Sequence, residues 1–266
     1  MEELIKAIIL GIVQGLTEWL PVSSTGHLRM VEHLLELELP ILFDVILHVG
    51  TVIVVLSFFR KEIRRMLSAL THLDFEDEYG KIVPLIIVGV IPTLLIGMVF
   101  GRLIEDTFQG ILPIAIALVF SGLIVYSAKF GKAEIESIGY SKAIIIGIAQ
   151  GIAIIPGISR SGATIAVALL LGIKREKAFE FSFLLSIPAI LGALSLTIYT
   201  EFDRLASSSL GWAEIFAGAI ISMLVGYVAL KLLRKTITVG KFHLFAFYCW
   251  LLGVVLILLF GVLQLF

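Results

Sequence analysis

Six runs of about 20 mostly apolar residues dominate this chain, and they constrain its fold more than any other feature. A helix needs roughly 20 such residues to cross the hydrocarbon core of a bilayer. The 266-residue chain is 59% hydrophobic and 15% charged, whereas a soluble domain has about 25% charged residues. We therefore expect an all-α polytopic membrane protein. Its six transmembrane helices are predicted near 39–59, 82–100, 111–128, 178–199, 212–231 and 244–264.

Two further apolar regions, 4–37 and 143–173, are each interrupted near the middle. The interruptions read "LPVSSTGH" and "IPGISRSGAT". Proline, glycine and hydroxyl residues mark helix ends and starts, so each region is predicted to be a re-entrant helix-loop-helix hairpin. The longest polar stretch, from Arg60 to Lys81, is predicted to be a loop.

The two interrupted regions resemble each other at a fixed offset of 136 residues. Each predicted half, about 1–130 and about 140–266 of a single domain, then holds one hairpin and three spans. A hairpin returns to its own side and three spans change sides, so the second half starts on the opposite face. The sequence therefore predicts an inverted-topology internal repeat, which places polar sites near the midplane. The offset pairs Gly11, Gln14, Gly15, Ser23 and Gly26 with Gly147, Gln150, Gly151, Ser159 and Gly162.

The basic residues are distributed unevenly between the predicted loops. Of the 20 lysines and arginines, 15 fall on one predicted side and one, Arg160, lies in the second interruption. The other side has four: Lys6, Arg29, Arg102 and Arg204. Cytoplasmic loops carry the excess of positive charge. We therefore expect a multi-pass plasma-membrane protein with both termini and the mouth of the first hairpin outside. The net charge of −1 gives no sign of nucleic-acid binding.

The first interruption combines a carboxylate, an amide, hydroxyls and an imidazole. Gln14 and Glu18 share a helix face, and an ionisable group at membrane depth indicates a functional site. Gly11 and Gly15 allow another helix to approach closely. The alternative is that the amide and carboxylate join helices while the serines cap them. The candidate site residues here are Gln14, Glu18, Ser23, Ser24, Thr25 and His27.

The second interruption has the features of an anion site. Gly157 and Gly162 let backbone N–H groups converge at a helix N-terminus. Arg160 adds a planar fork that suits phosphate oxygens. In the alternative interpretation the segment is only a helix break, and Arg160 pairs with a buried acid such as Glu18. Further hydrogen-bond donors are available from Ser159, Ser161 and Thr164.

The predicted repeat brings the two interruptions together, an acid and an imidazole facing an arginine and an anion cradle. These groups can hold a phosphate, neutralise developing charge and move protons, as phosphoryl transfer requires. A site at membrane depth implies a phosphate attached to a lipid. The residues alone therefore favour an enzyme of phosphoryl transfer that acts on a lipid phosphate. The rival is a secondary transporter or flippase for lipid phosphate, since inverted repeats with broken helices are typical of that class.

The segments "QGLTEWLPVSSTGH" and "PGISRSGAT" resemble the two signature motifs of the undecaprenyl-diphosphatase family, the bacitracin-resistance BacA type. "FDVILHVGT" and "FEFSFLLSIPAILGA" are similar to that family as well. The resemblance implies removal of the terminal phosphate from a C55 polyprenyl diphosphate, which gives the lipid carrier of cell-wall synthesis. The family has Glu or Gln four residues before an invariant Glu. Here that position is Gln14, which puts a two-carboxylate mechanism in doubt.

Carried over by position, the resemblance implies a core of Glu18, His27 and Arg160, with Ser24 and the segment 159–164 contacting phosphate. The nucleophile stays open between Ser24 activated by His27, His27 itself, and water activated by Glu18. The resemblance also implies Mg²⁺ or Ca²⁺. Glu18 with phosphate oxygens is the candidate ligand set.

Several other features leave alternatives open. Asp44 and His48, four residues apart, either pair with each other or support the site. The tryptophans fit membrane-interface or lipid-packing roles. Glycine-rich faces leave a homodimer open.

Overall fold

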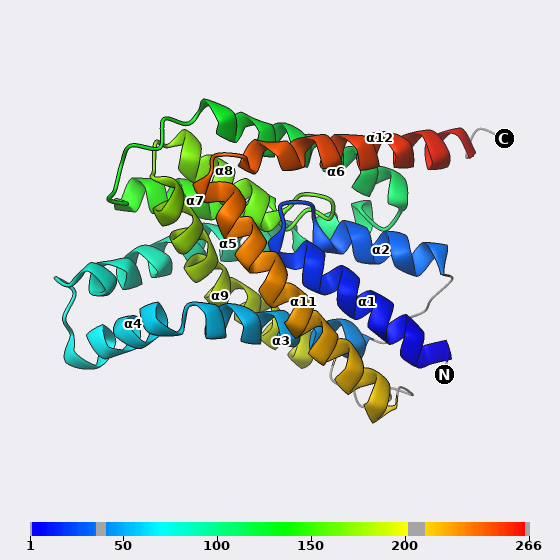
Figure 1. Cartoon of the computed structure of the whole chain (residues 1–266), viewed down its shortest axis with the longest axis horizontal. Coiled ribbons are helices and arrows are strands. Elements are labelled where there is room, and N and C mark those ends of the chain that lie inside the picture. Colours follow the sequence, from blue (N-terminus) through cyan, green and yellow to red (C-terminus); the bar gives the residue numbers. More distant parts are fainter. Residues whose placement is uncertain (1, 36–40, 202–210, 264–266) are drawn as a thin grey trace.

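Helices form almost all of the regular structure in this computed structural model, which describes residues 2–35, 41–201 and 211–263. The only other element in those ranges is an isolated bridge between Ile135 and Ile173. The predicted all-α class is confirmed (Figure 1). The elements are α1 (Glu2–Trp19), α2 (Ser24–Leu34), α3 (Ile41–Phe58), α4 (Arg60–His72), α5 (Glu78–Thr107), α6 (Ile111–Ser127), η1 (Ala128–Phe130), α7 (Tyr140–Ile152), α8 (Arg160–Leu170), α9 (Arg175–Thr200), α11 (Trp212–Thr238), η2 (Phe242–Leu244) and α12 (Phe245–Leu263).

Five of these helices are long and apolar enough to cross a membrane, and the number is six if the bent pair α3 and α4 counts as one span. The count applies to the described residues. The predicted span limits agree with α6 and α9 within a few residues, whereas α5 and α11 extend beyond their apolar runs into charged sequence. Residues 39, 40 and 264 of the predicted spans lie outside the described residues.

The prediction of a loop from Arg60 to Lys81 is wrong, because α4 occupies most of it. Ala69 is buried, and Ile63 and Met66 pack against the hydrophobic core, so one side of α4 is apolar. Because charged residues occupy its other faces, this short apolar stripe does not appear as a long apolar run in the sequence. The polar link that follows ends at Asp77, whose side chain caps α5 by accepting from the N–H of Tyr79.

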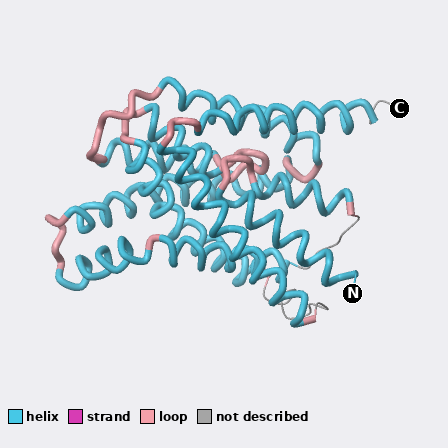
Figure 2. Tube along the Cα trace, in the orientation of Figure 1, coloured by secondary structure: helices cyan, strands magenta, loops and turns pink. Residues whose placement is uncertain are grey.

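The helices on either side of each interruption form a hairpin, and the two hairpins enter from opposite ends of the molecule. α1 begins at the end where α12 finishes, and α2 leads back toward it (Figure 1). There, His33 of α2 contacts Phe260 of α12. The second hairpin, α7 and α8, has both outer ends at the opposite end, where the bridge between Ile135 and Ile173 joins its flanks. The two connecting loops lie in the middle of the molecule (Figure 2).

The two halves of the chain pack across each other through small residues. A Cβ on Gly11 would lie 2.7 Å from the carbonyl oxygen of Gly218, so α1 and α11 are in close contact. Gly147 of α7 lies in the same way against the carbonyl oxygen of Gly89 of α5. The predicted close helix approach is thus confirmed. It occurs within one chain, so these glycine faces are covered without a second copy.

A second, shorter repeat gives α5 and α11 the small-residue faces that pack against the hairpins. Each of these two helices carries a glycine, a hydroxyl residue and another glycine at intervals of four residues, and the two sets lie 129 residues apart in the sequence. Thr93 donates to the carbonyl oxygen of Gly147 at 3.0 Å, and Ser222 donates to that of Leu47 at 3.3 Å. Small residues permit the close approach, and the hydroxyls link neighbouring backbones.

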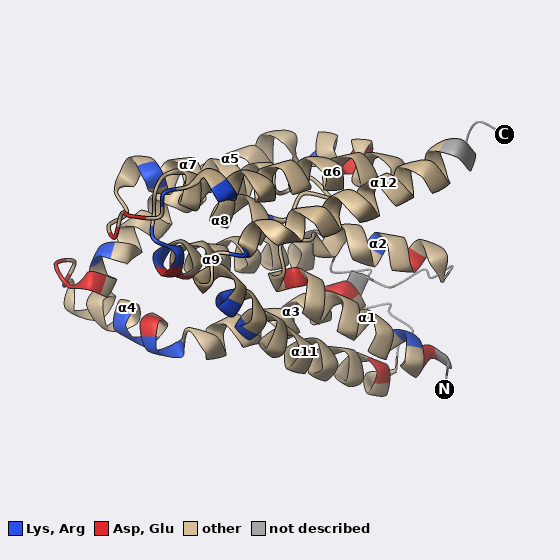
Figure 3. Cartoon of the chain, turned by 45° about the horizontal axis from the view of Figure 1, so that its top comes forward, with Lys and Arg blue, Asp and Glu red and all other residues tan. Residues whose placement is uncertain are grey.

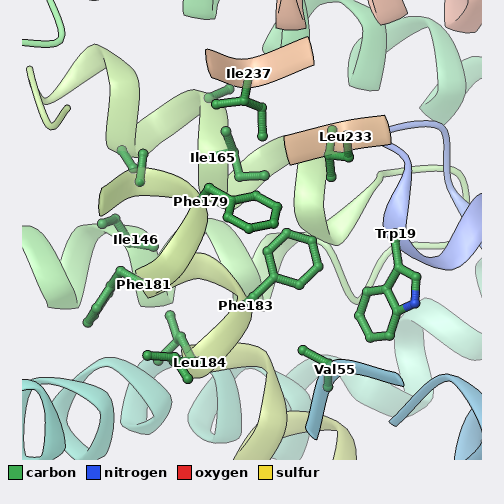
Figure 4. Packing of buried hydrophobic residues seen from close by; sticks show 14 of the residues in the cluster. Trp19, Val55, Ile146, Ile165, Phe179, Phe181, Phe183, Leu184, Leu233 and Ile237 are labelled. Atoms are coloured by element: carbon green, nitrogen blue, oxygen red, sulfur yellow. The ribbon is translucent and has the colours of Figure 1, made fainter. Parts of the chain in front are cut away.

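The main hydrophobic core lies beside the hairpin tips and is rich in aromatic rings. Trp19 and Phe183 have ring centroids 5.4 Å apart, and Phe179 is 4.7 Å from Phe183 (Figure 4). The prediction that Trp19 lies at the membrane interface or in lipid packing is wrong, because its exposed fraction is 0%. Trp212 is 74% exposed, as an interfacial residue would be.

Candidate functional site

The two interruptions meet through direct hydrogen bonds at the hairpin tips. The N–H of Gly157 donates to the Oγ of Ser23 at 3.2 Å. Both residues have positive φ, 68° at Ser23 and 100° at Gly157, a backbone conformation that L-residues rarely adopt. The same Ser23 hydroxyl caps α2 by accepting from the N–H of Gly26 at 3.4 Å. One serine therefore fixes the start of α2 and joins the two repeats.

Glu18, at the end of α1, is the hub of the polar cluster. Its side chain is buried, with a residue exposure of 8%. Oε2 accepts from the Oγ of Ser24 at 2.8 Å and from the Nε2 of Gln14 at 3.1 Å, while Oε1 forms an ion pair with Arg160. Arg160 also lies 5.5 Å from the ring centroid of Trp19. The carboxylate thus contacts a hydroxyl of its own hairpin and the guanidinium of the other.

The pairing of Arg160 with Glu18, an alternative at the sequence level, is present in the structure. This ion pair does not engage the backbone N–H groups at the start of α8. Ser159 caps this helix by accepting from the N–H of Gly162 at 3.1 Å. The N–H groups of a helix's first turn have no partner within the helix. Those of Arg160 and Ser161 therefore remain suited to an anion, which the helix dipole also favours.

The remaining hydroxyls of the second interruption have defined positions. Ser159 and Ser161 have their Oγ atoms 3.3 Å apart, and the N–H of Ser159 donates to the Oγ of Ser121 at 3.1 Å. Thr164 donates to the carbonyl oxygen of Arg160 at 2.9 Å, so its hydroxyl is engaged with the backbone. In the first interruption Ser24 is half-buried and Thr25 is exposed.

His48 lies beside Glu18, a position that the sequence alone did not decide. Its Nε2 is 3.7 Å from the Oε2 of Glu18, and its Nδ1–H donates to the backbone carbonyl of Asp44 at 2.9 Å. The ring is thus oriented by the backbone of Asp44, and its free edge faces Glu18. Of the two alternatives for Asp44 and His48, the geometry matches support of the site.

His27 has Ser23 and Tyr248 as its hydrogen-bond partners. Its Nδ1–H donates to the carbonyl of Ser23 at 2.8 Å, and its Nε2 lies 2.7 Å from the Oη of Tyr248. The two rings stack with centroids 5.6 Å apart. Both nitrogens are therefore engaged within the protein. Sequence reasoning missed Tyr248, for which no local signal exists, and Ser121, a lone hydroxyl in an apolar run that the cost of burying polar groups could have flagged.

The residues present do not form a metal cage. In the described ranges no three His, Cys, Asp or Glu side chains group as ligands. Glu18 is the only carboxylate at the hub, and both of its oxygens already accept from donors. A dedicated divalent site would need several oxygen ligands that this cluster does not supply.

Comparisons with known proteins identify one family over most of the chain. The family model described as bacitracin resistance protein BacA matches residues 7–255. The chain belongs to this family. An undecaprenyl-diphosphatase of Halothermothrix orenii is 41% identical over 98% of this chain and 99% of its own length. Proteins of the same name from Methanosphaera stadtmanae and Carboxydothermus hydrogenoformans are each 40% identical, over 97% and 96% of this chain and 99% and 96% of their own lengths. The BacA match includes both interruptions and the helices that hold them.

Proposed function

We propose that this protein is an integral-membrane lipid diphosphatase that hydrolyses undecaprenyl diphosphate to undecaprenyl phosphate and inorganic phosphate. One observation carries the proposal: Glu18, Ser24 and Arg160, drawn from two hairpins, meet at one point beside a helix N-terminus. The relatives that are about 40% identical over nearly the whole chain are named for this activity. The product is the lipid carrier used in assembling cell-envelope polymers.

Arg160 is proposed to change partners when substrate binds. In the structure it neutralises the buried Glu18. A diphosphate carries more negative charge than one carboxylate and can accept both arms of the guanidinium fork. Transfer of Arg160 to the terminal phosphate, with the N–H groups that begin α8, then leaves Glu18 free to take a proton. Substrate binding would thus create the base that the reaction needs.

Ser24 is the proposed nucleophile, and Glu18 is its proposed base. Their 2.8 Å hydrogen bond is within the range expected for such a pair. The Oγ of Ser24 forms a bond to the terminal phosphorus, the bond from that phosphorus to the bridging oxygen breaks, and undecaprenyl phosphate leaves. Glu18 takes the serine proton, and water then hydrolyses the phosphoserine. His48 is proposed to stabilise the charge on Glu18, and Gln14 to orient it. His27 would position the hairpin tip through Ser23 and Tyr248.

A divalent ion is proposed to arrive with the substrate. Mg²⁺ commonly binds through phosphate oxygens and water with only one or two carboxylates. Because Glu18 is the single carboxylate at the hub, Mg²⁺ or Ca²⁺ would be held chiefly by the diphosphate.

The proposed topology has six transmembrane helices and two re-entrant hairpins in one inverted-repeat domain. The hairpins enter from opposite ends, and lysines and arginines concentrate at the end where α4 lies (Figure 3). The positive-inside rule then assigns that end to the cytoplasm. The first hairpin, and with it the entrance to the site, would open on the extracytoplasmic side. Cysteine labelling from each side of sealed vesicles tests this orientation, and labelling of α4 from outside would reverse it.

The test of function is phosphate release from undecaprenyl diphosphate by the detergent-purified protein. Wild type is expected to release one phosphate per lipid, while Glu18→Ala and Ser24→Ala lose most of the activity. Arg29→Ala, which removes an exposed charge on α2, serves as the control. A phosphorylated Ser24, trapped from labelled substrate, would identify the nucleophile. Full activity in Ser24→Ala would refute that role, and lipid flipping in liposomes without phosphate release would refute the enzyme.

A further inference from the structure

A cavity of about 590 Å³ lies away from the end of the molecule where α1 begins and α12 finishes. It is bounded by the elbow where α3 meets α4, which are bent by 78°, and by the last turns of α11. This basic cavity is lined by five cationic side chains and one acid: Arg60, Lys61, Lys231, Arg234, Lys235 and Glu62. It lies apart from the polar cluster around Glu18 and plays no part in the proposed hydrolysis.

The five cations of the basic cavity outnumber its one carboxylate, that of Glu62. In the described parts of the chain none of its five cations forms an ion pair with a carboxylate. Other cations at the same end do so: Lys174 pairs with Glu136, and Lys177 with Glu78 at 2.6 Å. The positive-inside rule explains why cations lie at this end. It does not explain why five of them surround one cavity that Glu62 alone among acidic residues lines.

The walls of the basic cavity combine charge with aromatic surface. Lys231 lies 4.5 Å from the ring centroid of Tyr227, and Arg234 lies 5.9 Å from that of Phe58. Aromatic rings at such a level are typical of the boundary between acyl chains and headgroups. Cations placed just beyond them are therefore at the level where lipid phosphates lie.

An exposed apolar track continues from the cavity toward the middle of the membrane. Ile53 on α3 lies one helical turn before Ser57 of the cavity wall and is 43% exposed. On α11, Leu224 and Val228 precede Tyr227 and Lys231 by three residues and are 61% and 64% exposed. Residues three or four apart share a helix face. The cavity and the track thus fit a molecule with an anionic head and apolar chains, which free phosphate lacks.

We propose that the basic cavity binds the phosphate headgroup of an anionic membrane lipid, with the acyl chains along α3 and α11. The cations of α4 and α11 hold the phosphate from two sides. The bend between α3 and α4 brings these cations together, so the lipid would join the two elements. The site lies in the leaflet opposite to the entrance proposed for the substrate. This inference does not depend on the hydrolytic function, and either can fail without the other.

The test is native mass spectrometry of the full-length protein in detergent, titrated with dioleoylphosphatidylglycerol or dioleoylphosphatidylcholine. Lys231→Gln/Lys235→Gln removes two charges from the cavity. The matched control is Lys129→Gln/Lys132→Gln, which removes two exposed charges at the same end, one of them 5.7 Å from the ring of Tyr126. Wild type and control are expected to bind phosphatidylglycerol at least about tenfold more tightly than the cavity variant.

Two further measurements keep the outcome decisive. A tenfold molar excess of inorganic phosphate is expected to leave the bound lipid in place, and displacement of the lipid by that excess would overturn the assignment to a lipid. Equal affinity of wild type for both lipids, or unchanged affinity in the cavity variant, would overturn the site. If thermal unfolding shows that the cavity variant is misfolded, Arg60→Gln/Lys61→Gln on the opposite wall carries the same expectation.

Discussion

The two hairpin tips share a backbone design and differ in chemistry. In both, a serine caps the second helix through the N–H of a glycine three residues later, Ser23 with Gly26 and Ser159 with Gly162. At the first position of that helix, however, one hairpin has Ser24 and the other has Arg160. Both side chains contact Glu18. The repeat thus supplies the geometry twice, and a few unequal residues turn the symmetric frame into an asymmetric site.

The largest effect is expected where the two tips differ most. Arg160→Ser gives the second tip the residue that the first has at the equivalent position. Loss of the guanidinium should lower kcat/KM for phosphate release about 10³-fold, as removal of an arginine that stabilises a phosphoryl transition state does. Arg160→Lys keeps the charge without the planar fork, so its kcat/KM should lie between those of the wild type and the serine variant. A serine variant within tenfold of wild type would contradict the proposed role; Arg102→Ser, an exposed site on α5, is the control.

The glycines that pack each hairpin against the other half of the chain also differ in their contacts. A Cβ on Gly15 would lie 2.7 Å from the carbonyl oxygen of Ser222, a backbone atom, whereas one on Gly151 would meet the side chain of Ile96. Gly15→Ala should therefore reduce the free energy of unfolding by about 1–3 kcal/mol, and Gly151→Ala by less. The measurement is thermal unfolding in detergent. Gly101→Ala, with nothing within 4 Å, should be neutral or stabilising.

The two capping serines should differ in the second bond that each makes. Ser159→Ala removes a helix cap and the contact with the hydroxyl of Ser161, which can rotate to another partner, and should cost about 1 kcal/mol of stability. Ser23→Ala also leaves the N–H of Gly157 without its acceptor, which should bring the cost to about 2 kcal/mol. Equal shifts in the unfolding midpoint would mean that the link between the tips adds nothing. Ser68→Ala, at an exposed position of α4, provides the baseline.

The smallest expected change in kcat/KM concerns the two glutamines of the repeat, Gln14 and Gln150. Gln14 donates to Glu18, whereas Gln150 donates to Thr93 at 3.2 Å, remote from any charged partner. Gln14→Leu should lower kcat/KM about tenfold, the loss of one hydrogen bond to a charged group. Gln150→Leu should leave kcat/KM within about twofold. Similar initial rates for the two variants would show that Gln14 does not orient the carboxylate.

The all-α class and the helix breaks at the two interruptions could be predicted because each depends on residues close together in sequence. Apolar length predicts a span, and the glycine and serine spacing predicts a capped break. α4 could not be predicted, since its single apolar stripe is too short to stand out. The partners of the site residues are tertiary. Tyr248 lies 221 positions from His27, and nothing near His48 indicates that it faces Glu18.

The pairing of Glu18 with Arg160 has a consequence for biogenesis. The carboxylate is made 142 residues before its guanidinium partner, which at 5–20 residues per second is roughly 7–28 s of translation. Over the same interval α1 also lacks α11, its packing partner. We therefore expect the nascent N-terminal hairpin to stay beside the insertion machinery or at the water interface until the ribosome has delivered the second half.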